Sequence, residues 1–229
     1  RKLMPNNRNS SSQWEQDVVL LAKNTHVWLA QLSRKYSKPI LTLDQIPQEE
    51  LNEIHSIGIT GLWLVGLWER SPASRRIKQL YGHDHLIGSA YSINGYEVAA
   101  DLGGEPALGI LGEKAVKARI SLVCDMVPNH TGLDCPWILD HPDWYIGTFK
   151  KPVSTWEYNS ENLSPRDGIQ IRIEDGYYTQ QEAAEAFQYT TSLGFGPLYI
   201  YHGNDGTSMP WNDTAQLNYL NPRVREEVK

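Results

Sequence analysis

Three residues that follow an apolar run have side chains suited to holding a polar ligand. Residues 120–123 read Ile-Ser-Leu-Val, and Asp125, Asn129 and His130 come within the next seven positions. An acid, an amide and an imidazole together supply the donors and acceptors that bind sugar hydroxyls. The same residues also fit a structural role, in which Asp125 pairs with a buried arginine and Asn129 forms an Asx turn. Their position alone leaves both interpretations open.

Two other polar clusters contain residue types that can bind metal ions. Residues 81–85 read Tyr-Gly-His-Asp-His, and an alternating His-Asp-His loop without further ligands is more typical of a solvent-facing segment. Residues 203–206 read Gly-Asn-Asp-Gly, which lacks EF-hand spacing and predicts a tight turn. A metal-dependent hydrolase using His83, Asp84 and His85 stays as a less favoured alternative.

The composition excludes several classes of partner. The chain has 229 residues and is 40% hydrophobic, enough for a sizeable core. Its formal charge of -6, without a basic stripe, argues against nucleic acid, and no segment approaches the ~20 apolar residues of a membrane span. The 8 Trp and 12 Tyr against 3 Phe fit either ordinary packing or a surface that stacks on sugars.

Apolar periodicity in the first half predicts alternating helices and strands. The expected elements are a helix at 12–22, a strand at 25–29, a helix at 46–57, a strand at 59–68, a long connection at 69–104, a helix at 105–119 and a strand at 120–127. Near-continuous apolar strands alternating with helices predict an α/β fold with a parallel sheet. No glycine-rich phosphate fingerprint follows these strands, which favours a (β/α)₈ TIM barrel over a nucleotide-binding sheet.

The second half predicts a small β-rich domain inserted into that barrel. Isoleucines alternate with polar residues at 169–173, Asp175-Gly176 predicts a hairpin turn, and 177–179 the start of its return strand. A second hairpin is expected around 192–197, with 198–201 as its return arm, and a helix resumes at Asn221-Pro222. The predicted domains are 1–134 (barrel), 135–212 (insert) and 213–229 (return to the barrel).

The helix that starts at Asn221 runs to the last residue, and the first residue is Arg1 rather than methionine. We therefore expect the chain to be the front part of a longer protein. Alone, it is expected to expose sheet edges, to be poorly soluble and to be inactive.

Four segments in order resemble the α-amylase family of glycoside hydrolases (glycoside hydrolase family 13). They are Gly58–Trp68 (GITGLWLVGLW), Ala90–Tyr96 (AYSINGY), Asp125–His130 (DMVPNH) and Gln216–Asn218 followed by Asn221–Arg225. The resemblance implies a (β/α)₈ barrel with a β-rich domain inserted after strand three. It agrees with the fold expected from the periodicity.

The resemblance also implies roles for single residues. His130 would contact the sugar in the cleavage subsite, and Asp125 would support the site through a later arginine. Asn129 would correspond to a calcium-ligating asparagine of the family. The tyrosine that stacks on the sugar aligns with Tyr91, with Tyr96 as the second choice.

The chain departs from the family at several positions. Gly95, Ala90 and Gly66 stand where members commonly have Asp, Gly and Pro, and Gln216 stands where calcium-dependent members have an aspartate ligand. No calcium site and no cofactor is therefore assigned. In the family, the two catalytic carboxylates follow barrel strands four and five, so no Asp or Glu here is assigned as catalytic.

The sequence thus predicts part of a retaining α-glucan-active glycosidase or transglycosidase that acts on an α-glucan or oligosaccharide. The alternative is a non-catalytic, α-amylase-like binding or accessory subunit. Sequence beyond Lys229 would discriminate the two, since an enzyme must carry the strand-four Asp and the strand-five Glu.

Overall fold

The structure is a computed structural model that describes residues 18–83, 86–178, 184–194, 196–206 and 209–229. The chain forms two compact units, each made of two segments. The first unit contains Arg1–Leu67 and Val98–Asp125, and the second contains Trp68–Glu97 and Met126–Lys229. Among the described residues, no helix has the length and apolar character needed to cross a membrane.

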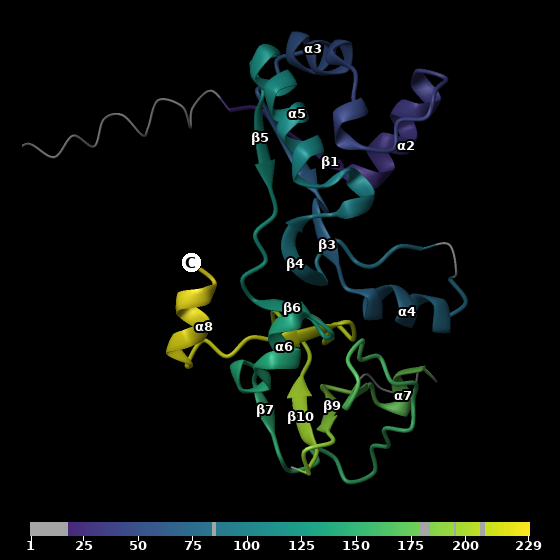
Figure 1. Ribbon diagram of the computed structural model, residues 1–229, viewed down its shortest axis with the longest axis vertical. Helices are drawn as coiled ribbons and strands as arrows, with labels where there is room; N and C mark the ends of the chain where they lie inside the picture. The colour runs from purple at the N-terminus through teal and green to yellow at the C-terminus, as the bar shows by residue number, and fades with distance from the viewer. Residues whose placement is uncertain (1–17, 84–85, 179–183, 195, 207–208) are drawn as a thin grey trace, which may run out of the picture. The chain divides into compact units, whose positions relative to one another are not determined.

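The first unit is built on a three-stranded parallel sheet (Figure 1). Its strands are β1 (Leu20–Asn24), β2 (Gly61–Val65) and β5 (Ser121–Cys124), in the order β1-β2-β5. The central strand β2 has three buried side chains out of five, whereas β1 and β5 are largely exposed. The predicted α/β class is therefore confirmed, with an open sheet whose two edge strands are uncovered.

Helices connect these strands. They are α2 (Thr25–Lys35), η1 (Leu43–Gln45), α3 (Gln48–Ser56), η2 (Ala100–Leu102) and α5 (Gly104–Lys117). The helices predicted at 46–57 and 105–119 are confirmed as α3 and α5. Gly58, with φ of +91°, follows the end of α3 and allows the chain to leave the helix. Lys114 ties α5 to η1, because its Nζ donates to the carbonyl oxygens of Asp44 (2.6 Å) and Ile46 (2.8 Å).

The strand predicted at 25–29 is wrong, because these residues begin α2. The Asn24 side chain caps this helix by accepting from the Val27 amide, and Thr25 Oγ1 donates to the carbonyls of Val65 and Gly66. Local capping and these long-range bonds outweigh the strand propensity of the β-branched and aromatic residues. The strand instead lies at Leu20–Asn24 and overlaps the last three residues of the helix predicted at 12–22. Residues 12–17 of that prediction lie outside the described part.

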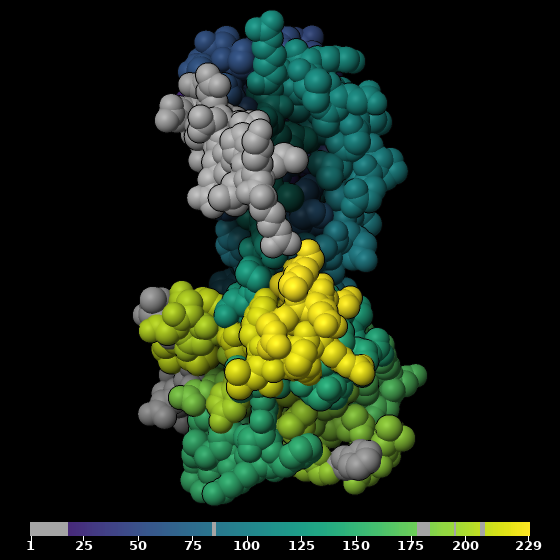
Figure 2. Space-filling model, turned by 90° about the vertical axis from the view of Figure 1, so that its left-hand side faces the viewer, coloured from purple at the N-terminus to yellow at the C-terminus, as the bar shows by residue number. Residues whose placement is uncertain are grey.

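The second unit consists of short elements in three small sheets. Its elements are β3 (Trp68–Arg70), α4 (Pro72–Leu80), β4 (Ile93–Val98), β6 (His130–Gly132), α6 (Pro136–Asp140), η3 (Pro142–Trp144), β7 (Gly147–Thr148), β8 (Ile169–Arg172), α7 (Asp175–Tyr178), β9 (Ala186–Thr191), β10 (Leu198–Tyr201), β11 (Thr214–Gln216) and α8 (Pro222–Glu227). β3 pairs with β4, β6 pairs with β11, and the largest sheet has the order β7-β10-β9-β8. The predicted helix after Asn221 is confirmed as α8, which lies on the surface of this unit with Val224 fully buried (Figure 2, yellow).

The segment at 69–104, predicted as a long connection, is not an irregular loop. It contains α4 and β4. The start of α4 carries a clear local signal. Ser71 is the N-cap and accepts from the Ser74 amide, and Pro72 occupies the first helical turn. This signal could have been found in the sequence.

Of the two predicted hairpins, the second is confirmed and the first is wrong. β9 and β10 pair antiparallel, with Leu198 opposite Tyr189. β8 pairs with β9 rather than with a strand at 177–179, and Asp175–Tyr178 forms the single turn α7; Thr179 lies outside the described residues. The Asp175 carboxylate accepts from the amides of Asn159 and Ser160, so this segment binds a loop instead of turning back as a strand.

A buried histidine in the second unit was not singled out from the sequence. His202, only 3% exposed, follows β10, and its Nδ1 donates to the carbonyl of Thr214 at 3.0 Å. Its Nε2 has no hydrogen-bond partner among the described residues. Protonation would leave a buried N–H without an acceptor, and burial lowers the pKa of His202 to about 4.

This burial predicts a loss of stability in acid. The ring is neutral in both states above its ordinary pKa of 6.5, whereas below it the unfolded chain takes up a proton that the folded chain resists. The free energy of unfolding should therefore fall by about 3 kcal/mol as the pH drops from 6.5 to 4. Denaturant unfolding of the wild type and of His202→Gln between pH 7.5 and 4 measures the effect. The variant should show a shallower pH dependence, and equal slopes would contradict the prediction.

Candidate functional site

His130 is placed by the pairing of two short strands in the second unit. β6 and β11 run antiparallel with His130 opposite Gln216. The ring is 6% exposed, with Nε2 3.2 Å from the carbonyl oxygen of Tyr91 and Nδ1 3.2 Å from the side-chain nitrogen of Asn129. A carbonyl can only accept and an amide NH₂ can only donate, so the proton resides on Nε2. Burial lowers the pKa of His130, which favours the neutral ring with its single proton on Nε2.

The aromatic ring of Trp211 packs beside the His130 ring. The two rings lie 5.0 Å apart at an angle of 51°. The Trp211 amide donates to the Gly203 carbonyl at 2.9 Å, which fixes the backbone of the tryptophan. A side chain at Gly203 would come within 3.0 Å of the His130 Cβ and 2.6 Å of the Thr214 hydroxyl, so this close approach requires glycine.

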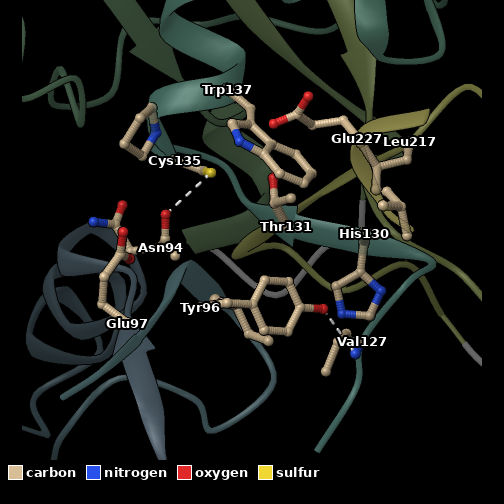
Figure 3. Close-up of a pocket in the computed structure, with 14 residues that line it drawn as sticks. Asn94, Tyr96, Glu97, Val127, His130, Thr131, Cys135, Trp137, Leu217 and Glu227 are labelled. Atoms are coloured by element: carbon tan, nitrogen blue, oxygen red, sulfur yellow. Dashed lines mark hydrogen bonds between the residues drawn. The ribbon is translucent and has the colours of Figure 1, made fainter. Parts of the chain in front are cut away.

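The two candidate tyrosines have different surroundings. The Tyr91 side chain is 45% exposed, and its carbonyl holds the His130 ring. The Tyr96 hydroxyl accepts from the Val127 amide at 3.0 Å (Figure 3). The Tyr96 ring also lies 5.5 Å from the Trp68 ring. Tyr91, Asn129 and His130 are therefore brought together, while Tyr96 supports the backbone of the segment that leads to His130.

A network of buried polar groups fixes the segment that carries Tyr91. Asp134, 2% exposed, accepts from the Ser71 hydroxyl (2.5 Å) and the Ala73 amide (2.8 Å) at the start of α4. Asp213 accepts from the Ser74 hydroxyl at 2.5 Å, and this hydroxyl in turn accepts from the Ser89 amide. The Ser92 hydroxyl donates to the Asp213 carbonyl at 2.6 Å. Residues 89–92 are thus held at both ends by bonds to distant parts of the second unit.

Asp125 belongs to the first unit, where it closes the end of the parallel sheet. It is 5% exposed and follows β5. Its two carboxylate oxygens accept from the Trp63 indole nitrogen (2.9 Å) and from the Gly66 amide (2.7 Å). Asp125 therefore ties the end of β5 to the end of β2.

A cavity of about 390 Å³ opens beside His130 in the second unit (Figure 3). Tyr96, Val127 and Trp137 contribute apolar wall, and Glu97 and Glu227 contribute carboxylates. The Cys135 thiol lies on the wall and donates to the Asn94 carbonyl at 3.2 Å. Burial raises the pKa of this thiol to about 11, so it is not a nucleophile near neutral pH.

The described residues contain no group of three or more His, Cys, Asp and Glu side chains able to hold a metal ion. Of the Tyr-Gly-His-Asp-His cluster, Asp84 and His85 lie outside the described residues. In the Gly-Asn-Asp-Gly segment the Gly206 amide donates to the Asn204 side-chain oxygen at 2.6 Å, which is an Asx turn.

Trp211, Gln216 and the network of Asp134 and Asp213 were not recognised as parts of the site from the sequence. Gln216 was noted only as a departure from the family pattern. Asp134 lies four residues after the motif and Trp211 lies one residue before the end of the expected insert, yet neither has local spacing that marks it. Their contacts include residues far away in the chain: Asp134 and Asp213 bond to residues 61 and 139 positions away, and Gln216 bonds to Asn129, 87 positions away. The Trp211 ring contacts His130, 81 positions away.

The contact with Asn129 predicts how His130 titrates. The wild-type ring should titrate below 6.5 with its proton on Nε2, whereas Asn129→Asp should raise its pKa above 6.5 by placing a carboxylate at Nδ1. Nuclear magnetic resonance of the ring nitrogens measures both. Asn52→Asp, on the exposed face of α3, adds the same charge in the first unit and should leave His130 unchanged. An unchanged His130 pKa in Asn129→Asp would show that this contact does not set its protonation.

The chain is similar in sequence to two known proteins and in fold to solved structures. No protein-family model matches the chain. It is 26% identical over 188 residues to a palatinase of Erwinia rhapontici, covering 78% of this chain and 27% of the relative. It is 21% identical over 182 residues to alpha-amylase 3 of Dictyoglomus thermophilum, covering 79% and 27%.

Among solved structures, trehalose-6-phosphate hydrolase of Bacillus licheniformis has a similar fold, with a TM-score of 0.54 and 17% sequence identity. The match covers 94% of this chain and 32% of the hydrolase chain. The chain therefore spans about a quarter to a third of the length of these relatives. The sequence matches agree with the resemblance of the four segments to the α-amylase family of glycoside hydrolases, and the solved structure shows a shared fold.

Proposed function

We propose that the chain is part of a retaining α-glucan-active glycoside hydrolase or transglycosidase and contributes the sugar-binding wall of its cleavage subsite. The observation that carries this proposal is the neutral His130 ring, held beside Tyr91 and Trp211 in one unit. Aromatic faces next to a hydrogen-bonding imidazole suit a ring that has apolar C–H faces and polar hydroxyl edges.

In this proposal, the first unit supplies three strands of a (β/α)₈ barrel. The exposed apolar side chains of its edge strands support this, since they include Leu20 (46%) in β1 and Val123 (39%) in β5. Further strands on both sides would bury them, as parallel sheets are normally covered. The division into barrel (1–134), insert (135–212) and return segment (213–229) belongs to the same proposal.

Four residues have proposed roles toward the sugar. His130 contacts it through Nε2–H, and Tyr91 stacks on it with its exposed ring. Asn129 sets the tautomer of His130, and Asp125 supports the strand end that leads toward it. Because Nε2–H already points to the Tyr91 carbonyl at 3.2 Å, a sugar hydroxyl must share this hydrogen or replace the carbonyl as its acceptor.

Bond cleavage is proposed to depend on residues outside this chain. A retaining glycosidase needs two carboxyl groups about 5 Å apart across the scissile bond, one as nucleophile and one as acid. The family places them after barrel strands four and five, and the chain is proposed to supply strands one to three. The 229-residue chain alone is therefore expected to be inactive.

The proposal predicts the effect of removing the imidazole from the complete protein. His130→Ala should lower turnover of an α-glucan oligosaccharide by about 100-fold, a loss typical of one hydrogen-bond donor in an active site. Circular dichroism should show that the fold survives. Steady-state kinetics on the variant and the wild type measure the effect.

His141→Ala is the matched control, because it removes a second imidazole of the same unit. The His141 ring stacks on Trp144 at 4.4 Å and has no proposed contact with sugar. This variant should keep turnover close to that of the wild type. Normal turnover in His130→Ala would refute the site assignment, and a protein without detectable turnover in its wild-type form would favour the accessory-subunit alternative.

A further inference from the structure

The surroundings of Asn129 do not fit the calcium ion that the family resemblance associates with this position. Calcium takes six to eight oxygen ligands at about 2.3–2.6 Å. The Asn129 side-chain oxygen instead accepts from the Gln216 side-chain nitrogen at 2.9 Å, and its backbone oxygen accepts from the same nitrogen at 2.9 Å. Both oxygens that could face a cation here face an N–H donor.

The other end of the Gln216 amide is also paired. Its oxygen accepts from the Asn129 side-chain nitrogen at 3.2 Å and from the Asn204 backbone amide at 3.1 Å. Two of these four partners are backbone atoms with fixed roles, a carbonyl acceptor and an amide donor. The orientation of the Gln216 amide is therefore determined by chemistry, since the flipped amide would lose both bonds.

The pairing of β6 with β11 brings these groups together. Gln216 lies opposite His130, and the Leu217 amide donates to the Asn129 carbonyl at 3.2 Å. The Gln216 amide thus joins three segments: the end of the DMVPNH motif, strand β11 and the turn at 203–206. A cation bound by oxygen atoms of the same three segments would make the same connection.

We propose that the Gln216 side chain replaces a calcium ion as the cross-link of this corner, so that the fold and the orientation of His130 are independent of calcium. By holding both polar atoms of the Asn129 side chain, Gln216 directs the Asn129 NH₂ group toward His130 Nδ1. Gln216 is a positioning residue, and this inference does not depend on activity toward glucans.

Thermal unfolding of the wild-type chain in 5 mM EDTA, in 5 mM CaCl₂ and in 5 mM MgCl₂ tests the metal independence. The expected melting temperature is the same in all three. Gln216→Glu replaces the donor NH₂ by an acceptor oxygen facing two Asn129 oxygens, so in EDTA its melting temperature should fall by about 5 °C. Calcium, but not magnesium, should recover part of this loss, because the new carboxylate supplies an oxygen ligand.

Gln170→Glu is the matched control, since it adds the same charge on the exposed side of β8 in the same unit and should leave the melting temperature unchanged. The His130 ring supplies a second readout. Its nuclear magnetic resonance signals should be unaffected by calcium in the wild type and shifted in Gln216→Glu. A wild-type chain that is stabilised by calcium over magnesium by several degrees, or a Gln216→Glu variant as stable as the control, would overturn the proposal.

Discussion

The antiparallel pairing of β6 with β11 is the interaction on which the rest of the site depends. It is short, with three residue pairs, yet it places His130 opposite Gln216 across a sequence separation of more than eighty residues. From this pairing follow the amide cross-link to Asn129, the single tautomer of His130 and the close approach of Gly203 to the histidine. The sheet of β7, β10, β9 and β8 contributes Ile169, Ile171, Phe187, Tyr189 and Ile200 to the buried core of this unit. Ala215 of β11 lies in the same core.

Burial determines the protonation and the hydrogen-bond partners of three polar side chains in this unit. His130 and His202 are both buried, but among the residues that the structure describes only His130 has partners for both ring nitrogens. Asp134 is buried with its oxygens directed at the start of α4, and burial raises the pKa of this carboxyl although its hydrogen bonds oppose the shift. Fully satisfied polar networks of this kind specify one arrangement of the chain. In this unit the network holds the loop that presents Tyr91.

The sequence predicted the parts of the structure that carry local signals. The helices α3 and α8, the apolar strand β2 and the hairpin of β9 and β10 each have their signals in adjacent residues. The strand predicted at Thr25–Leu29 failed because Thr25 bonds to carbonyls forty positions away. Tyr91 could be placed near His130 only through the family resemblance, because the bond that joins them spans 39 positions. Gln216 was visible in the sequence as a departure, but its hydrogen-bond partners define its role and they come from two other segments.

We propose that His130 and Tyr91 face a sugar in the complete protein. A crystal structure of that protein with a bound α-glucan oligosaccharide tests this claim most directly. We predict a sugar hydroxyl oxygen within about 3.2 Å of His130 Nε2 and the pyranose face against the Tyr91 ring. An oligosaccharide bound across the catalytic carboxylates without contact to either residue would contradict the account.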